Sequence, residues 1–127
     1  MRLFLVRHAH SDPGDPDELR PLSAKGREQA RELAEQLADV EPEAVLSSPL
    51  LRARETAEAI AKATSSPLRV DERLAPGATA DDLLAVAAGS STVIAVGHQP
   101  DCSEIAVALS GRDPGFPTAG VCELEVS

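Results

Sequence analysis

Two short runs of this sequence are apolar at every position, and they constrain the fold more than any other feature. The first run is residues 3–6 and the second is residues 93–96. Each is too short to be a helix, and a strand without polar positions is buried on both faces. Such strands are typical of the centre of a parallel sheet, which needs helices on both sides.

Helical patterns separate further strand-like runs along the chain. Ser23 resembles an N-cap. We expect helices at 26–39, 48–64, 80–88 and 101–109, and strands at 2–6, 44–47, 68–70, 92–96 and 121–126. This alternation predicts an α/β protein, a three-layer α/β/α sandwich with a mostly parallel central sheet of about five strands. The length of 127 residues, without a repeat or linker, predicts a single domain over 1–127.

Charge and composition argue against several classes of partner. The net charge is −9, so we expect neither a nucleic-acid surface nor an acidic-membrane surface. No apolar stretch approaches the length of a membrane span, and residues 1–6 are too short for a signal-peptide core. We therefore expect a cytoplasmic protein in which Cys102 and Cys122 stay reduced as small apolar side chains.

Two of the three histidines directly follow the apolar runs. Arg7 and His8 follow the first run, and Gly97 and His98 follow the second. The carboxyl ends of parallel strands meet at one edge of a sheet, where open α/β sheets place their ligands. We therefore expect these residues to lie close together, with Gly97 permitting close approach of the backbone.

Arg52 lies in the first turn of the helix that follows the strand at 44–47. An arginine there works against the helix dipole unless it holds an anion, whereas Arg54 is expected on the surface. Arginine binds phosphate oxygens with two parallel hydrogen bonds, and a neutral imidazole is a competent nucleophile. With Arg7, His8 and His98, Arg52 predicts a phosphate site with its own nucleophile, in which a cationic second histidine stabilises the transferring group.

Four blocks of this sequence resemble the motifs of the histidine phosphatase superfamily. Residues 5–9 are similar to its Arg-His-Gly signature, and residues 48–57 resemble its Ser-Pro-x-x-Arg-Ala-x-x-Thr helix start. Residues 20–30 resemble its first helix with the preceding loop, and residues 97–98 match its second histidine. The short length and the missing insertion look most like the SixA branch, whose members are phosphohistidine phosphatases.

The resemblance implies a phosphoglycerate mutase-like fold and a phosphatase that needs neither a metal nor a cofactor. It implies that His8 is transiently phosphorylated, while Arg7, Arg52 and His98 form the phosphate pocket. Arg20 lies in a block that resembles a pocket-lining arginine, so it is a predicted substrate contact, as is Gly97. The implied partner is a phosphorylated substrate, in this branch a phosphohistidine-bearing protein.

Two positions depart from the family pattern. Ala9 stands where the signature has Gly, so the backbone there must be accessible to an L-residue. The carboxylic acid that many members carry in an insertion after the third strand has no counterpart in residues 71–77. A donor is less necessary when phosphate leaves a protonated imidazole, because that group departs neutral. The remaining candidates for a proton donor are Asp71, Glu72, Asp81 and Asp12.

Other functions fit parts of the pattern. A metal hydrolase would use His8, His10 and His98 with Cys102, but nearby arginines would repel the cation. A mutase of the same superfamily needs a lid over its phosphoenzyme, and the connection after the third strand is short. A small-molecule phosphomonoesterase would bind the same phosphate. A non-catalytic phosphate-binding module would lack one of the two strand-end histidines.

Overall fold

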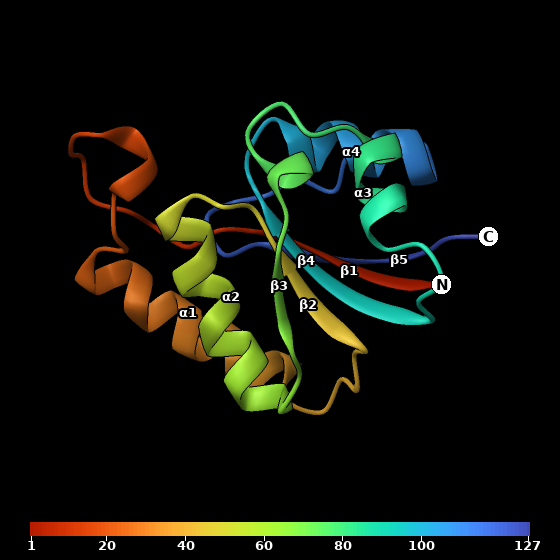
Figure 1. The fold of residues 1–127 in the computed structure, drawn as a ribbon, viewed down its shortest axis with the longest axis horizontal. Coiled ribbons are helices and arrows are strands. Elements are labelled where there is room, and N and C mark those ends of the chain that lie inside the picture. Colours follow the sequence, from red (N-terminus) through yellow and green to blue (C-terminus); the bar gives the residue numbers. More distant parts are fainter.

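Five strands form one sheet in the computed structural model, which describes residues 1–127 (Figure 1). The strands are β1 (Arg2–Arg7), β2 (Ala44–Ser47), β3 (Leu68–Val70), β4 (Thr92–Gly97) and β5 (Val121–Glu125). Their order across the sheet is β3-β2-β4-β1-β5. All neighbouring pairs are parallel except β1 and β5, which are antiparallel. The predicted mostly parallel sheet is confirmed.

Two pairs of helices cover the two faces of this sheet (Figure 1). On one face lie α1 (Ala24–Leu37) and α2 (Leu51–Thr64), and on the other lie α3 (Ala80–Val86) and α4 (Asp101–Ser110). Two short 3-10 helices, η1 (Asp17–Leu19) and η2 (Glu72–Leu74), interrupt the loops. The architecture is therefore the predicted three-layer sandwich. None of the helices has the length and apolar character needed to cross a bilayer.

The apolar run of β1 divides its side chains between two cores. Phe4 and Val6 pack beneath α1 and α2, whereas Leu3 and Leu5 pack beneath α3 and α4. All four are buried. Burial of each such side chain contributes roughly 1.5–3 kcal/mol relative to exposure. An uninterrupted apolar run is thus what a central strand with helices on both faces requires.

The starts of the first two helices differ in how well the sequence predicts them. Ser23 caps α1 as expected, because its Oγ accepts a hydrogen bond from the Gly26 amide at 3.0 Å. The second helix begins at Leu51 rather than at Ser48. The Ser48 hydroxyl instead accepts from the Leu50 amide at 3.2 Å and faces His98. Ser48 is therefore part of the strand-to-helix turn.

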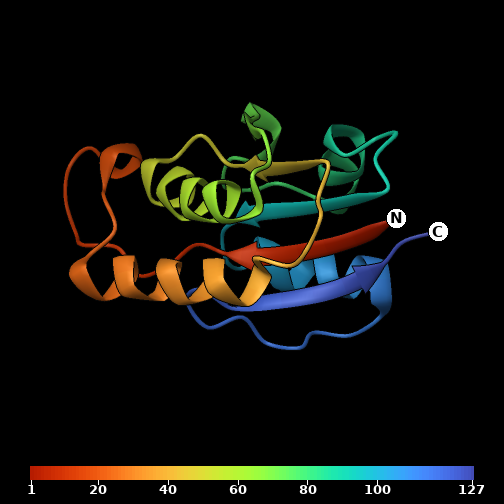
Figure 2. The ribbon, with the colours of Figure 1, turned by 90° about the horizontal axis from the view of Figure 1, so that it is seen from below.

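The parallel strands all end at the same edge of the sheet. In Figure 2 the arrowheads of β1, β2 and β4 point towards the side where the loop that follows β1 lies. Arg7 and His8 therefore lie beside Gly97 and His98, and the His8 amide donates to the Gly97 carbonyl at 3.0 Å. This edge also receives the first turn of α2, which carries Arg52.

Candidate active site

A polar cavity of about 330 Å³ opens at the carboxyl edge of the sheet. It brings together Arg7, His8, Arg52 and His98, the four residues predicted to act on phosphate, and it also includes Arg20. The full lining consists of Arg7, His8, His10, Ser11, Arg20, Arg52, Pro76, His98, Gln99 and Thr118. The lining has three guanidinium groups and no carboxylate, which is a composition suited to an anion.

His8 stands at the end of β1 with one ring nitrogen fixed. Its Nδ1 lies 2.7 Å from the Ala9 carbonyl oxygen. A carbonyl only accepts, so Nδ1 carries the ring proton and Nε2 keeps its lone pair. Burial lowers the pKa of His8 below 6.5, and the charges of the nearby arginines lower it further, against the opposing effect of the backbone bond. His8 is therefore a neutral imidazole at neutral pH.

His98 is buried, with 4% of its surface exposed, whereas His8 is half-buried. Its Nε2 lies 2.7 Å from Ser48 Oγ, and its ring centroid lies 5.1 Å from that of His8. Because Ser48 Oγ already accepts from the Leu50 amide, its hydroxyl proton is available to Nε2. Nδ1 then carries the proton of the neutral ring and can donate to a ligand.

In the free site His98 is uncharged, whereas the sequence predicts a cationic second histidine only beside the transferring phosphate. Burial, followed by the charges of His8 and Arg52, lowers the pKa of His98 to about 3. At neutral pH the ring is uncharged and acts as a hydrogen-bond donor, so the positive charge of the site comes from the arginines.

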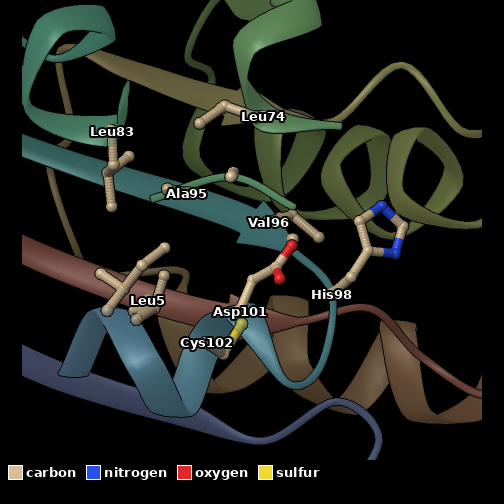
Figure 3. A pocket seen from close by; sticks show the side chains of 11 residues that line it. Leu5, Leu74, Leu83, Ala95, Val96, His98, Asp101 and Cys102 are labelled. Atoms are coloured by element: carbon tan, nitrogen blue, oxygen red, sulfur yellow. The ribbon is translucent and has the colours of Figure 1, made fainter. Parts of the chain in front are cut away.

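His98 also borders a small apolar cavity of about 20 Å³ (Figure 3). Leu5, Leu74 and Leu83 line it on the side of the sheet that faces α3 and α4. The thiol of Cys102 lies at its edge, where burial raises the pKa to about 12. Gly97 lines this apolar cavity and not the polar one.

The arginines differ in what they hold. Arg7 donates to the Phe116 carbonyl at 2.9 Å, while its buried Nε has no partner. Arg52 donates through Nη2 to Asp17 Oδ2 at 3.2 Å and through Nη1 to the Asp17 carbonyl at 2.9 Å. Arg20 donates to Asp17 Oδ1 at 3.0 Å. One carboxylate thus bridges Arg20 and Arg52 with two anionic oxygens.

Sequence reasoning missed Asp17, because its loop has no periodic pattern. Hydrogen bonding from Arg20, followed by the charge of Arg52, lowers the pKa of Asp17, so its carboxylate is ionised at neutral pH. Arg54 also differs from expectation, since its Nε is buried without a partner rather than on the surface. The one signal in the sequence that could have identified Asp17 is that Arg20 follows it three residues later.

The predicted proton donors lie outside the polar cavity. Asp71 instead binds Arg73, whose hydrogen bonds lower the pKa of Asp71 to about 2. The other three, Glu72, Asp81 and Asp12, are likewise absent from the lining. No three His, Cys, Asp or Glu side chains meet in an arrangement suited to a metal ion.

Asp101 is buried and holds a loop at the rim of the polar cavity. Its Oδ2 accepts from the Gly77 amide at 2.8 Å, and this fixes the turn that places Pro76 at the rim. Asp101 also lies in the first turn of α4, where a negative charge is favourable. Ala9 is fully buried, and its φ is not positive, so alanine replaces the glycine of the family signature without strain.

Sequence comparison connects this chain to one family. Residues 3–76 match the model of the histidine phosphatase superfamily (branch 1). An uncharacterized protein of Picosynechococcus sp. is 36% identical, covering 91% of this chain and 76% of that protein. An uncharacterized protein of Mycobacterium tuberculosis is 34% identical, covering 96% of this chain and 87% of that protein.

Solved structures share the fold over nearly the whole chain. The protein histidine phosphatase SixA in complex with tungstate has a TM-score of 0.87 at 27% identity, covering 97% of this chain and 86% of that one. A protein from Agrobacterium tumefaciens that carries the name SixA has a TM-score of 0.86 at 28% identity, covering 98% and 90%. Tungstate is a tetrahedral oxyanion, so the first of these structures holds a phosphate-like group.

Proposed function

Because this chain belongs to the histidine phosphatase superfamily, in its SixA-like branch, we propose that it is a phosphatase that works through a phosphohistidine at His8. The observation that carries the proposal is the convergence of His8, His98, Arg7 and Arg52 on one polar cavity. A nucleophile and a set of phosphate-binding groups are then in place together.

In the first step, His8 Nε2 attacks the phosphorus atom in line with the leaving group. The new N–P bond forms as the bond to the leaving group breaks, and the leaving group takes the electron pair. Arg7, Arg52 and the Nδ1–H of His98 hold the remaining phosphate oxygens, and the substrate phosphate displaces the Asp17 carboxylate from Arg52. The arginines supply the positive charge that a metal supplies elsewhere.

In the second step, water attacks the phosphorus of phospho-His8. The P–N bond breaks and its electron pair returns to Nε2. The hydrogen bond from Nδ1 to the Ala9 carbonyl keeps a proton on the ring throughout, so His8 departs as a neutral imidazole. This bond therefore favours both formation and hydrolysis of the intermediate.

The proposed substrate is a phosphohistidine-bearing protein. A phosphohistidine whose second ring nitrogen is protonated leaves as neutral imidazole and needs no carboxylic acid, in agreement with a cavity lined by none. Arg20 is the proposed substrate contact at the rim. The Gly97 contact remains a prediction, and a Cβ at that position would meet no protein atom within 4 Å.

The test compares wild type with His8→Ala on an aryl phosphate and on a phosphohistidine peptide, in the presence of EDTA. We expect the wild type to turn over both and to yield an acid-labile, base-stable phosphoenzyme after rapid quenching. The variant should give neither. Arg52→Ala should lose activity, whereas Arg112→Ala, which changes an exposed arginine outside the cavity, is the matched control. Substantial turnover by His8→Ala would show that the covalent mechanism is wrong.

A further inference from the structure

We propose that His10 is a further catalytic residue, which gives a proton to the leaving group and later accepts one from the attacking water. The inference rests on the proposed function, because it assigns a role within that reaction. His10 lies two residues beyond the nucleophile and lines the same cavity.

The composition of the cavity leaves His10 as the group suited to this task. Among the lining residues, only histidine exchanges protons readily near neutral pH. His8 uses Nε2 as the nucleophile and Nδ1 to bind the Ala9 carbonyl. His98 is buried against Ser48 and serves as a fixed donor. The third imidazole has no function in the two displacements described above.

One ring nitrogen of His10 is held by Ser23, at the start of α1. Its Nδ1 lies 2.6 Å from Ser23 Oγ. The Ser23 hydroxyl donates to the His10 carbonyl at 3.3 Å, and the same Oγ accepts from the Gly26 amide at 3.0 Å. Ser23 therefore accepts the proton of Nδ1, and Nε2 is the nitrogen left to exchange a proton with a ligand.

The backbone of His10 is held by the same helix. The Gln29 side chain accepts from the His10 amide at 2.9 Å, and the His10 carbonyl accepts from the Ser23 amide at 3.0 Å. A Cβ on Gly26 would lie 1.8 Å from the His10 carbonyl oxygen, so only glycine permits this approach. Three residues of the helix start thus orient one imidazole, which is the preorganisation that proton transfer requires.

The proton balance closes over the two steps. Cationic His10 transfers the Nε2 proton to the leaving atom as the bond from that atom to phosphorus breaks. His10 then stays neutral, with Nδ1–H still on Ser23. When water attacks phospho-His8, the Nε2 atom of His10 takes a proton from the water. The bond between phosphorus and His8 breaks, its electron pair returns to His8, and inorganic phosphate leaves. His10 is again cationic, and no other reactant is needed.

The role predicts which substrates depend on His10. A nitrophenolate leaves without a proton, and a phosphohistidine already protonated on its second nitrogen leaves as neutral imidazole. An alkoxide is a poor leaving group and needs the proton. His10 therefore widens the substrate range of this site towards phosphate esters of alcohols, beyond the phosphohistidine peptide.

The experiment measures kcat/KM over a series of phosphate esters, from dinitrophenyl through phenyl to alkyl, for wild type, His10→Asn and Ser23→Ala. The ratio kcat/KM contains only the steps up to phosphoenzyme formation, so hydrolysis of the intermediate does not mask the effect. We expect His10→Asn to lose about 100-fold or more on the alkyl ester and less than about threefold on the dinitrophenyl ester. Ser23→Ala should show the same trend more weakly.

The slope of log kcat/KM against the pKa of the leaving group decides the outcome. A merely structural role of His10 would lower kcat/KM by the same factor for all esters. An unchanged slope in His10→Asn, with a wild type that forms the phosphoenzyme, overturns the inference and leaves the proposed function standing. A wild type that hydrolyses no ester and no phosphohistidine peptide overturns both. Thermal unfolding of each variant verifies that the loss does not arise from misfolding.

Discussion

The ends of β1 and β4 are neighbours in one sheet and carry the same side chain, yet they give it opposite properties. His8 is half-buried, and its Nδ1 is tied to the carbonyl of the next residue. His98 is buried, and its Nε2 is tied to a serine 50 positions away in the chain. The free nitrogen is therefore Nε2 in the first ring and Nδ1 in the second.

This difference shows how one fold edge produces a nucleophile and a donor from the same residue type. A local backbone bond leaves His8 with a lone pair directed at the ligand side. A hydrogen bond from Ser48, which lies in the turn before α2, occupies Nε2 of His98 and leaves its Nδ1–H on the ligand side. Burial of His98, together with the charges of His8 and Arg52, then keeps that ring uncharged. The roles follow from which nitrogen is occupied, not from the strand on which the histidine lies.

The largest effect should come from replacing the nucleophile. His8→Ala should reduce kcat on the order of 10⁴-fold or more, because no other group can form the intermediate. Binding of tungstate or inorganic phosphate, measured by calorimetry, should persist, because the arginines remain. Loss of both activity and anion binding would mean that His8 is needed to assemble the cavity.

Replacing the donor should be less severe. His98→Ala removes one hydrogen bond to the transferring group, which is worth about 10²–10³-fold in kcat. The variant should still become labelled on His8 after rapid quenching, more slowly than wild type. If His98→Ala abolished labelling while His8→Ala retained it, the two roles would be reversed.

Removing the bond that orients the donor should cost less again. In Ser48→Ala, His98 keeps its place but loses the partner of Nε2, and we expect a decrease in kcat of about tenfold. Nitrogen NMR provides a readout that a merely structural role would not change. Wild-type His98 should show the Nδ1–H tautomer, and the variant a mixture. An unchanged tautomer in the variant would argue against the role of Ser48.

The smallest effect should be that of mild acid. Between pH 8 and pH 6.5, less than about half of His8 becomes protonated, because its folded-state pKa is below 6.5. An NMR titration should show His8 protonating first and His98 only near pH 3. Observation of His98 protonating at a higher pH than His8 would contradict the stronger lowering of the His98 pKa.

The same titration has a consequence for stability. The unfolded chain takes up protons on these histidines below about pH 6.5, whereas the folded chain resists them. The stability they contribute is therefore complete above pH 6.5 and declines as the pH falls towards 3. In urea unfolding, His98→Asn should show a shallower decline over this range than wild type.

Much of the fold could be predicted from residue patterns. The all-apolar run of β1 identified a central strand, and Ser23 marked the start of α1. The four phosphate-site residues were predictable because three of them lie at the end of a strand or directly after it, and parallel strands end together. The start of α2 was placed too early, because Ser48 and Pro49 look like a helix start but form the preceding turn.

The contacts within the site were less accessible to sequence reasoning. Asp17 reaches Arg52 from an irregular loop, and no periodicity connects the two. The acids proposed near the third strand proved to lie outside the cavity, where Asp71 binds its neighbour Arg73. From the sequence His10 resembles only a metal ligand, because its bond to Ser23 depends on how the loop folds back onto α1.

The sequence by itself determined the layers, the parallel strands and the edge at which histidines and arginines gather. These follow from apolar patterns a few residues long, which indicate directly which side chains are buried. Only the tertiary structure decided which nitrogen of each histidine is free, that His98 is uncharged, and that Asp17 bridges Arg20 and Arg52. Hydrogen bonds and desolvation at a site depend on atoms brought together from distant parts of the chain, and that arrangement exists only after folding.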